Sequence, residues 1–244
     1  MPDTPVTLTV DGVEIEAILG QTIIEACDDA GIYIPRLCYY PGLTPGGQCR
    51  LCSVEVHGRI VGACHTPVVD GMVVQNETPA LIQDRRAIIE MLFVSGNHRC
   101  PECEKSGDCD LQAMAYRLGL LAPTLPYIEP ARGIDATHPG IYIDRDRCIL
   151  CGLCVRASQT LDGKSVFGFK GRGANMQLAV NSEDGLGDTD LELTDKAAHV
   201  CPVGAIVVKQ AGNLAPWGQR KYDREPIGTD IEEKRAPHHA RQAE

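Results

Sequence analysis

Twelve cysteines, most of them gathered in three short runs, constrain this 244-residue chain more than any other feature. A disulfide-stabilised secreted domain would be smaller and would carry more cysteines for its length. The amino terminus lacks a basic stretch followed by an apolar one, and no apolar stretch is long enough to span a bilayer. We therefore expect a cytoplasmic protein without a membrane span, whose reduced thiols are available to bind metal.

The net charge of the chain indicates which kinds of partner it can bind. The chain has 33 acidic and 23 basic side chains, and its net charge is -10. Such a chain is a poor candidate for nucleic-acid binding, because contacts with a phosphate backbone need a basic face. Residues 1–79 hold 10 of the acidic and 3 of the basic groups. This acidic segment could attract a basic partner, although a solvated surface is the simpler interpretation.

The first cysteine group has the spacing C-x10-C-x2-C-x11-C and consists of Cys38, Cys49, Cys52 and Cys64. Four thiolates ligate a 2Fe–2S cluster. Glycines in the first gap let backbone N–H groups approach the sulfurs. The alternative is a zinc site, but zinc ribbons usually present two C-x2-C pairs and this group has one. We therefore predict a 2Fe–2S cluster here.

The second group is H-x-C-x2-C-x5-C, formed by His98, Cys100, Cys103 and Cys109. One 2Fe–2S and two 4Fe–4S clusters need about twelve protein ligands. Cys27 lies on the apolar face of a predicted helix and is interpreted as a core residue. Eleven thiols remain, so we predict His98 as the twelfth ligand. Its alternative role is a surface histidine beside a cluster that lacks one protein ligand.

The third group, C-x2-C-x2-C followed far downstream by Cys-Pro, consists of Cys148, Cys151, Cys154 and Cys201. This spacing is typical of a 4Fe–4S cluster, and the single distant Cys-Pro indicates that the cluster is isolated. Positive charge from Arg145, Arg147 and Arg156 would stabilise its reduced state. The chain has no loop motif typical of nucleotide or flavin binding. We therefore expect redox centres and no substrate site on this chain.

Hydrophobic patterning predicts an α+β fold in four parts. Residues 1–78 carry a hairpin with an Asp11-Gly12 turn, a helix over 22–30 and three short strands, as in a β-grasp 2Fe–2S ferredoxin-like domain. Residues 79–122 form a small helical domain for the His/Cys cluster, with helices from Pro79 and over 111–121. After a proline-rich linker, residues 137–212 form a 4Fe–4S ferredoxin-like domain with short strands and a helix near 194–200. Residues 213–244 are a polar tail, disordered or wrapped over a partner.

The three motifs in this order resemble a known module over about residues 5–210. The segments YIPRLCYY, GNHRCPECEKSGDCDLQ and DRDRCILCGLCVR carry the likeness. The module is similar to the amino-terminal part of the large iron–sulfur subunit of complex I, of iron-only hydrogenases and of NAD-dependent formate dehydrogenases. It most resembles the small diaphorase subunits of bidirectional NAD-reducing nickel–iron hydrogenases. These have the same short gap between the histidine and the next cysteine.

This resemblance implies electron transfer within a hydrogen:NAD⁺ oxidoreductase. The implied partners are the large and small nickel–iron hydrogenase subunits and a flavin- and NAD-binding diaphorase subunit. The implied cofactors are one 2Fe–2S cluster and two 4Fe–4S clusters. An electron-transfer subunit of a formate dehydrogenase or a complex I-like assembly is the alternative within redox chemistry, and a zinc-stabilised scaffold is the alternative outside it.

Overall fold

The computed structural model describes residues 4–128, 131–210 and 215–235. They form two compact units. The first unit contains the described residues of 1–36, 49–88 and 225–244, and the second contains those of 37–48 and 89–224. The division falls within helix α2 (Pro79–Val94). The helix begins at Pro79 as predicted, and Thr78 caps it, because its hydroxyl accepts a hydrogen bond from the backbone N–H of Leu81 at 3.2 Å.

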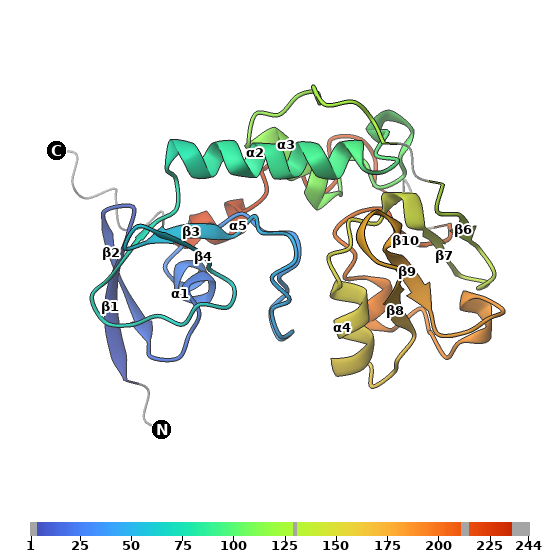
Figure 1. Ribbon diagram of the computed structural model, residues 1–244, viewed down its shortest axis with the longest axis horizontal. Coiled ribbons are helices and arrows are strands. Elements are labelled where there is room, and N and C mark those ends of the chain that lie inside the picture. Colours follow the sequence, from blue (N-terminus) through green and yellow to red (C-terminus); the bar gives the residue numbers. More distant parts are fainter. Residues whose placement is uncertain (1–3, 129–130, 211–214, 236–244) are drawn as a thin grey trace. The chain divides into compact units, whose positions relative to one another are not determined.

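The first unit is built on a five-stranded sheet with the order β2-β1-β5-β3-β4 (Figure 1). Strands β1 and β5 are parallel, and the other neighbours are antiparallel. The Asp11-Gly12 turn joins β1 to β2 with both residues at positive φ, as a type I′ turn requires. Val6, Leu8 and Val10 alternate toward the core. The strands are β1 (Pro5–Val10), β2 (Val13–Ile18), β3 (Ser53–Val56), β4 (Arg59–Gly62) and β5 (Met72–Gln75).

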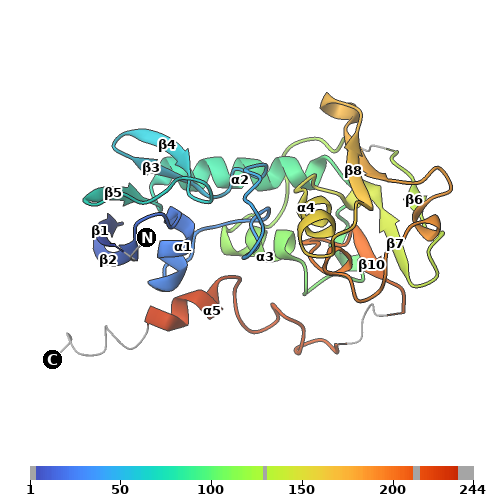
Figure 2. The same ribbon diagram turned by 90° about the horizontal axis from the view of Figure 1, so that it is seen from below.

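Helix α1 (Ile23–Asp29) packs against this sheet and supplies much of the core. It begins at a complete capping box formed by Thr22 and Glu25, which satisfies two backbone donors at the helix start. Helix α5 (Thr229–Glu232) lies beside α1 (Figure 2), where the Lys234 ammonium donates to the Asp28 carbonyl at 3.1 Å. A mixed sheet with one packed helix confirms the predicted β-grasp, ferredoxin-like fold.

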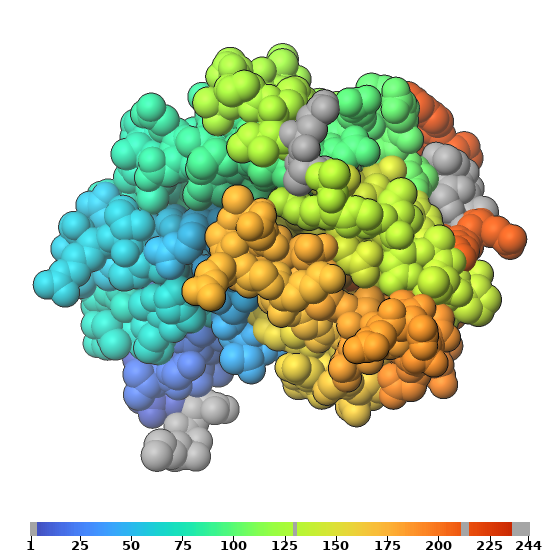
Figure 3. Space-filling view, turned by 45° about the vertical axis from the view of Figure 1, so that its right-hand side comes forward, coloured from blue at the N-terminus to red at the C-terminus, as the bar shows by residue number. Residues whose placement is uncertain are grey.

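The second unit combines the end of α2 with α3 (Asp110–Arg117), α4 (Leu153–Thr160) and two small antiparallel sheets. The first sheet has the order β10-β7-β6, with β6 (Ile134–Asp135), β7 (Ile141–Asp144) and β10 (Ile206–Val208). The second pairs β8 (Phe167–Lys170) with β9 (Gln177–Val180). Ile141, Ile143 and Leu178 are fully buried in the core of this second unit. The loop 181–195 follows β9 on the face shown in Figure 3, and it buries Leu186 and Leu191.

Several details of the second unit differ from the prediction. Helix α4 and strands β6 and β10 were not expected. The helix expected near 194–200 is a single 3-10 turn, η5 (Lys196–Ala198), because backbone bonds there close over three residues. Helix α3 ends at Arg117, and Gly119 follows at positive φ. Among the described residues, every helix falls short of the length and apolarity that crossing a membrane requires.

Residues 215–224, from the tail that was expected to be disordered or to wrap over a partner, contact their own unit. The backbone N–H of Tyr222 donates to the Gly107 carbonyl at 2.9 Å. The Arg220 guanidinium donates to the Ser106 carbonyl at 3.0 Å and stacks over Trp217 at 4.4 Å. The tail therefore holds the loop between two of the predicted cluster ligands, Cys103 and Cys109.

Candidate metal centres

The structure brings the four cysteines of the third group together around one small, tightly lined cavity. Cys148 follows the 3-10 turn η2 (Arg145–Arg147), Cys154 lies in the first turn of α4, and Cys201 precedes β10. The other side chains around the cavity are apolar, and they are Ile149, Phe169, Leu178, Val203, Ala205 and Ile206. Four convergent thiols in a dry cavity are the donor set that a 4Fe–4S cluster needs.

Backbone N–H groups surround these sulfurs. That of Leu150 lies 3.4 Å from Cys148 Sγ. Leu150 adopts a φ of 55°, a left-handed conformation that turns the chain sharply within the motif. Burial raises the pKa of the Cys148 thiol to about 11. Metal binding at this cavity therefore has to release protons from buried thiols, and the N–H donors then stabilise the sulfur charge.

The cysteines of the second group lie on one loop of the same unit. Cys100 begins the 3-10 turn η1 (Cys100–Glu102), Cys103 follows it, and Cys109 is the N-cap of α3. Burial raises the pKa of the Cys109 thiol to about 12, and the charge of Cys100 contributes in the same direction. Within the described residues, no three His, Cys, Asp or Glu side chains are grouped as ligands of a single metal ion.

His98 lies just before this loop, and a glycine makes room for it. A Cβ atom on Gly96 would lie 2.4 Å from the Asp146 carbonyl oxygen and 3.0 Å from His98 Nε2. The His98 ring packs edge-on against Phe93 with centroids 5.8 Å apart. Burial, with the positive charge of Arg147, lowers the pKa of His98 to about 4. The imidazole is therefore neutral at pH 7, which is the form that ligates a metal.

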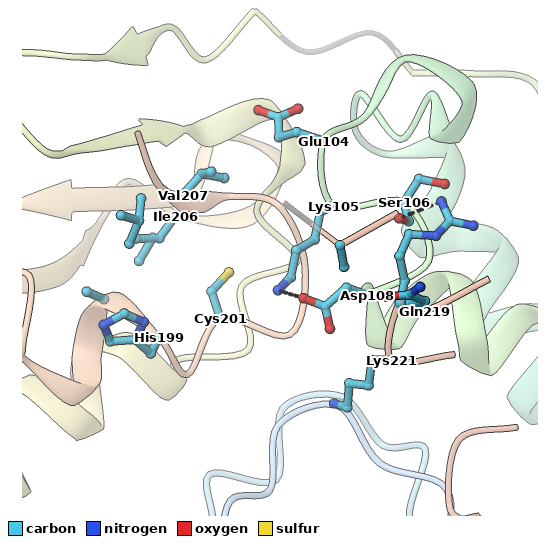
Figure 4. Close-up of a pocket in the computed structure, with 14 residues that line it drawn as sticks. Glu104, Lys105, Ser106, Asp108, His199, Cys201, Ile206, Val207, Gln219 and Lys221 are labelled. Atoms are coloured by element: carbon cyan, nitrogen blue, oxygen red, sulfur yellow. Dashed lines mark hydrogen bonds and ion pairs between the residues drawn. The ribbon is translucent and has the colours of Figure 1, made fainter. Parts of the chain in front are cut away.

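An ion pair joins the loops of the second and third groups. Arg147, the residue before Cys148, contacts Glu104, the residue after Cys103, at 2.8 Å. A cavity of about 490 Å³ separates the segment Glu104–Asp108 from Cys201, and residues of the tail complete its lining. Figure 4 shows Cys201 on one side of this cavity and Lys105 reaching into it. The ligand loops of the two predicted 4Fe–4S centres are thus held against each other within one unit.

The ligands predicted for the first group belong to both units. Cys49, Cys52 and Cys64 lie in the first unit and Cys38 lies in the second. Cys52 and Cys64 flank the β3–β4 hairpin, where the Ala63 N–H donates to the Cys52 carbonyl at 2.9 Å. Within the first unit, the hairpin therefore places two of the three thiols at the same end.

Two of the arginines expected to supply positive charge are neutralised locally. Arg145 pairs with Asp135 at 3.5 Å, and Arg147 pairs with Asp144 at 2.9 Å in addition to Glu104. Of these three arginines, only Arg156 supplies the expected uncompensated positive charge among the described residues. Its guanidinium donates to uncharged carbonyl oxygens, those of Cys38, Thr44, Cys151 and Gly152. Arg156 thereby ties the loop that carries Cys38 to the third cysteine group.

Sequence reasoning missed Arg85, whose guanidinium is buried behind Cys52 and donates to carbonyls on both sides of it. One signal in the sequence could have found this residue. Leu81, Arg85 and Ile89 are spaced by four residues and so share one helix face, and the two aliphatic residues are fully buried. A charged residue in the middle of an apolar stripe is a candidate for a buried cation.

Comparison with known families gives three matches along the chain. Residues 3–79 match the 2Fe-2S iron-sulfur cluster binding domain. Residues 85–123 match the NADH-ubiquinone oxidoreductase-G iron-sulfur binding region, and residues 141–208 match the 4Fe-4S single cluster domain. The fold and the cysteine loops therefore define an iron–sulfur protein with 2Fe–2S and 4Fe–4S cluster-binding domains.

Two similar proteins show to which family of iron–sulfur proteins the chain belongs. The chain is 36% identical over 224 residues to the NAD-reducing hydrogenase HoxS subunit gamma of Cupriavidus necator, covering 91% of this chain and 95% of that protein. It is similar to a chain in a crystal structure of NAD⁺-reducing [NiFe]-hydrogenase in the H2-reduced state, with 47% identity and a TM-score of 0.90. That match covers 94% of this chain and 98% of the other. The chain belongs to the family of the gamma subunit of NAD-reducing hydrogenases.

A second set of relatives is longer. The mitochondrial NADH-ubiquinone oxidoreductase 78 kDa subunit of Neurospora crassa is 35% identical over 223 residues, which cover 89% of this chain. The match spans 30% of that protein's length. The likeness to the complex I subunit therefore concerns one module of it.

Proposed function

We propose that the chain relays electrons between the large and small subunits of a nickel–iron hydrogenase and a flavin- and NAD-binding diaphorase subunit. The chain is an iron–sulfur electron-transfer subunit of the NAD-reducing [NiFe]-hydrogenase family. In this proposal it carries no substrate site of its own. When bound, iron–sulfur clusters supply centres that accept and release single electrons.

The proposed cofactors are one 2Fe–2S cluster and two 4Fe–4S clusters, each in its own segment of the chain. We assign them to segments 1–78, 79–122 and 137–212, with 213–244 as the tail. The ligands are Cys38, Cys49, Cys52 and Cys64 for the first; His98, Cys100, Cys103 and Cys109 for the second; and Cys148, Cys151, Cys154 and Cys201 for the third.

The observation that carries the proposal is the shared cavity of Cys148, Cys151, Cys154 and Cys201. Its aliphatic walls exclude water, and the Leu150 N–H directed at Cys148 Sγ can stabilise sulfur charge. The Arg147–Glu104 ion pair supports transfer between the second and third centres, since it holds their ligand loops together. These residues bind and shield redox centres and leave the chemistry of hydrogen and of NAD⁺ to partner subunits.

The test is anaerobic purification of the tagged chain from its native host, followed by identification of the copurified subunits and metal analysis. We expect nickel in the complex, a bound flavin, and about ten iron and ten acid-labile sulfide ions for each copy of this chain, after subtraction of those in its partners. Molybdenum in place of nickel would contradict the hydrogenase assignment. Zinc without acid-labile sulfide would contradict electron transfer altogether.

A further inference from the structure

Arg85 is a buried cation in the first unit, and only 2% of it is exposed. Its Nε donates to the Leu51 carbonyl at 2.9 Å, and one Nη donates to the Ser53 carbonyl at the same distance. The remaining bonds go to the carbonyl and side-chain oxygens of Asn76 at 2.7 and 2.8 Å. Every acceptor that the structure gives this guanidinium is an uncharged oxygen.

A buried positive charge of this kind needs a nearby negative charge to balance it. Among the described residues, no carboxylate lies within ion-pair distance of Arg85. Burial accordingly lowers the pKa of Arg85, and the more distant charges of Glu77 and Cys52 act in the opposite direction. Removing a guanidinium from water without a paired anion costs free energy, so buried cations in proteins usually face an anion or a bound anionic group.

The position of Arg85 indicates where that anion lies. Leu51 and Ser53 are the neighbours of Cys52 in the chain, and the carbonyl oxygen of each accepts a hydrogen bond from Arg85. Cys52 itself is buried and is close enough to affect Arg85 electrostatically. The guanidinium is thus hydrogen-bonded to the backbone on both sides of a proposed cluster ligand.

We propose that Arg85 is the counter-charge of the 2Fe–2S centre and raises its reduction potential. This inference rests on the proposed function, in which Cys52 ligates that centre. Four thiolates and two sulfides outweigh two ferric ions, so the centre is anionic before reduction. Reduction adds one electron, delivered from the hydrogenase side, and breaks no bond. A fixed cation nearby therefore favours the reduced form, and a low-dielectric surrounding strengthens its effect.

The test compares Arg85→Gln and Arg85→Met with Arg85→Lys in the complete complex, using EPR-monitored redox titration of the 2Fe–2S signal. The matched control is Arg86→Gln, which removes the same charge from an exposed neighbouring position on α2, where water and salt screen it. We expect a lower midpoint potential in both neutral variants, and potentials close to wild type in Arg85→Lys and Arg86→Gln. The 4Fe–4S potentials should stay unchanged in all four proteins.

A neutral variant that keeps the signal at the wild-type potential would overturn the proposal. If neither neutral variant retains the centre, Arg85→Lys decides, because it keeps the charge but not the planar set of donors. Retention of the signal by Arg85→Lys would then support a role for the charge, and its loss would reject that role in favour of hydrogen bonding alone. Absence of any 2Fe–2S signal from the wild-type complex would instead contradict the proposed function.

Discussion

Arg147 Nη1 and Glu104 Oε2 lie 2.8 Å apart and connect the two loops that carry the proposed 4Fe–4S ligands. The contact is partly shielded from water, with the two side chains 17% and 23% exposed. Arg147 also contacts Asp144 at 2.9 Å, so removal of Glu104 leaves the cation with one partner. The pair therefore contributes more than a solvated ion pair and less than a fully buried one.

A double-mutant cycle on this pair should give a coupling energy of about 1 kcal/mol. Glu104→Gln should speed iron release to a chelator about five-fold, on the scale where 1.4 kcal/mol is tenfold. Arg147→Gln should do more, because it leaves both Glu104 and Asp144 without their cation. Coupling indistinguishable from zero in the double variant would show that the pair does not hold the loops together.

Replacing Cys27 should leave the iron content unchanged, unlike replacement of a proposed ligand. Cys27 is fully buried on α1, whose other buried residues are Ile23, Ile24 and Ala26. We expect Cys27→Ala to retain all three clusters and to lose about 1 kcal/mol of stability through the small cavity it creates. Cys64→Ala should abolish the 2Fe–2S EPR signal. Loss of iron from the Cys27 variant would mean that the ligand assignment is wrong.

Cys27 should also contribute a defined dependence of stability on pH. Burial, with a smaller contribution from Asp28, raises the pKa of this thiol from 9.0 to about 12. Above pH 9 the unfolded state loses this proton first, so the thiol's contribution to stability is complete below pH 9 and falls as the pH rises toward 12. Urea unfolding should show wild type losing stability relative to Cys27→Ala in this window. Parallel pH profiles of the two proteins would contradict the raised pKa.

His98→Cys should keep the cluster and lower its reduction potential. A neutral imidazole is replaced by an anionic thiolate, which disfavours the added electron, as the comparison of Rieske with all-cysteine centres illustrates. The measurement is EPR-monitored redox titration, and His65→Gln, beside Cys64 of the first group, is the control that should not move this potential. An unchanged midpoint in His98→Cys would reject His98 as a ligand.

Deleting residues 213–244 should speed iron loss and weaken recovery of the complex. The deletion removes the Arg220 and Tyr222 contacts with the loop between Cys103 and Cys109. A milder form of the test is Tyr222→Phe, which removes the hydroxyl contact with Asp110, compared with Tyr127→Phe at an exposed tyrosine. Unaltered iron retention and subunit recovery after the deletion would show that the tail has no role in either.

Local sequence signals account for much of what was predicted correctly. The structure contains the predicted Asp11-Gly12 turn and the predicted helix over 22–30, which begins at the Thr22–Glu25 capping box. Each depends on residues within a few positions of one another. Helix α4 lacked such a signal, because it begins inside the third cysteine motif after Gly152, which offers no capping side chain.

The surroundings of the candidate centres depend on contacts between distant positions. Arg85 obtains its acceptors from residues 51, 53 and 76, and Arg147 obtains Glu104 from 43 positions away. Cysteine spacing alone does not indicate which arginines stay uncompensated. That distinction follows from tertiary structure, which leaves Arg85 and Arg156 on uncharged oxygens and pairs Arg145 and Arg147 with carboxylates.

The aliphatic lining around Cys148, Cys151, Cys154 and Cys201 has a kinetic consequence. When an electron arrives in water, solvent dipoles must reorient, and this rearrangement slows transfer. Few mobile dipoles border a cavity walled by Leu178, Val203 and Ile206. The reorganisation energy of a centre held there is therefore small, and rapid exchange with a neighbour needs little difference in potential.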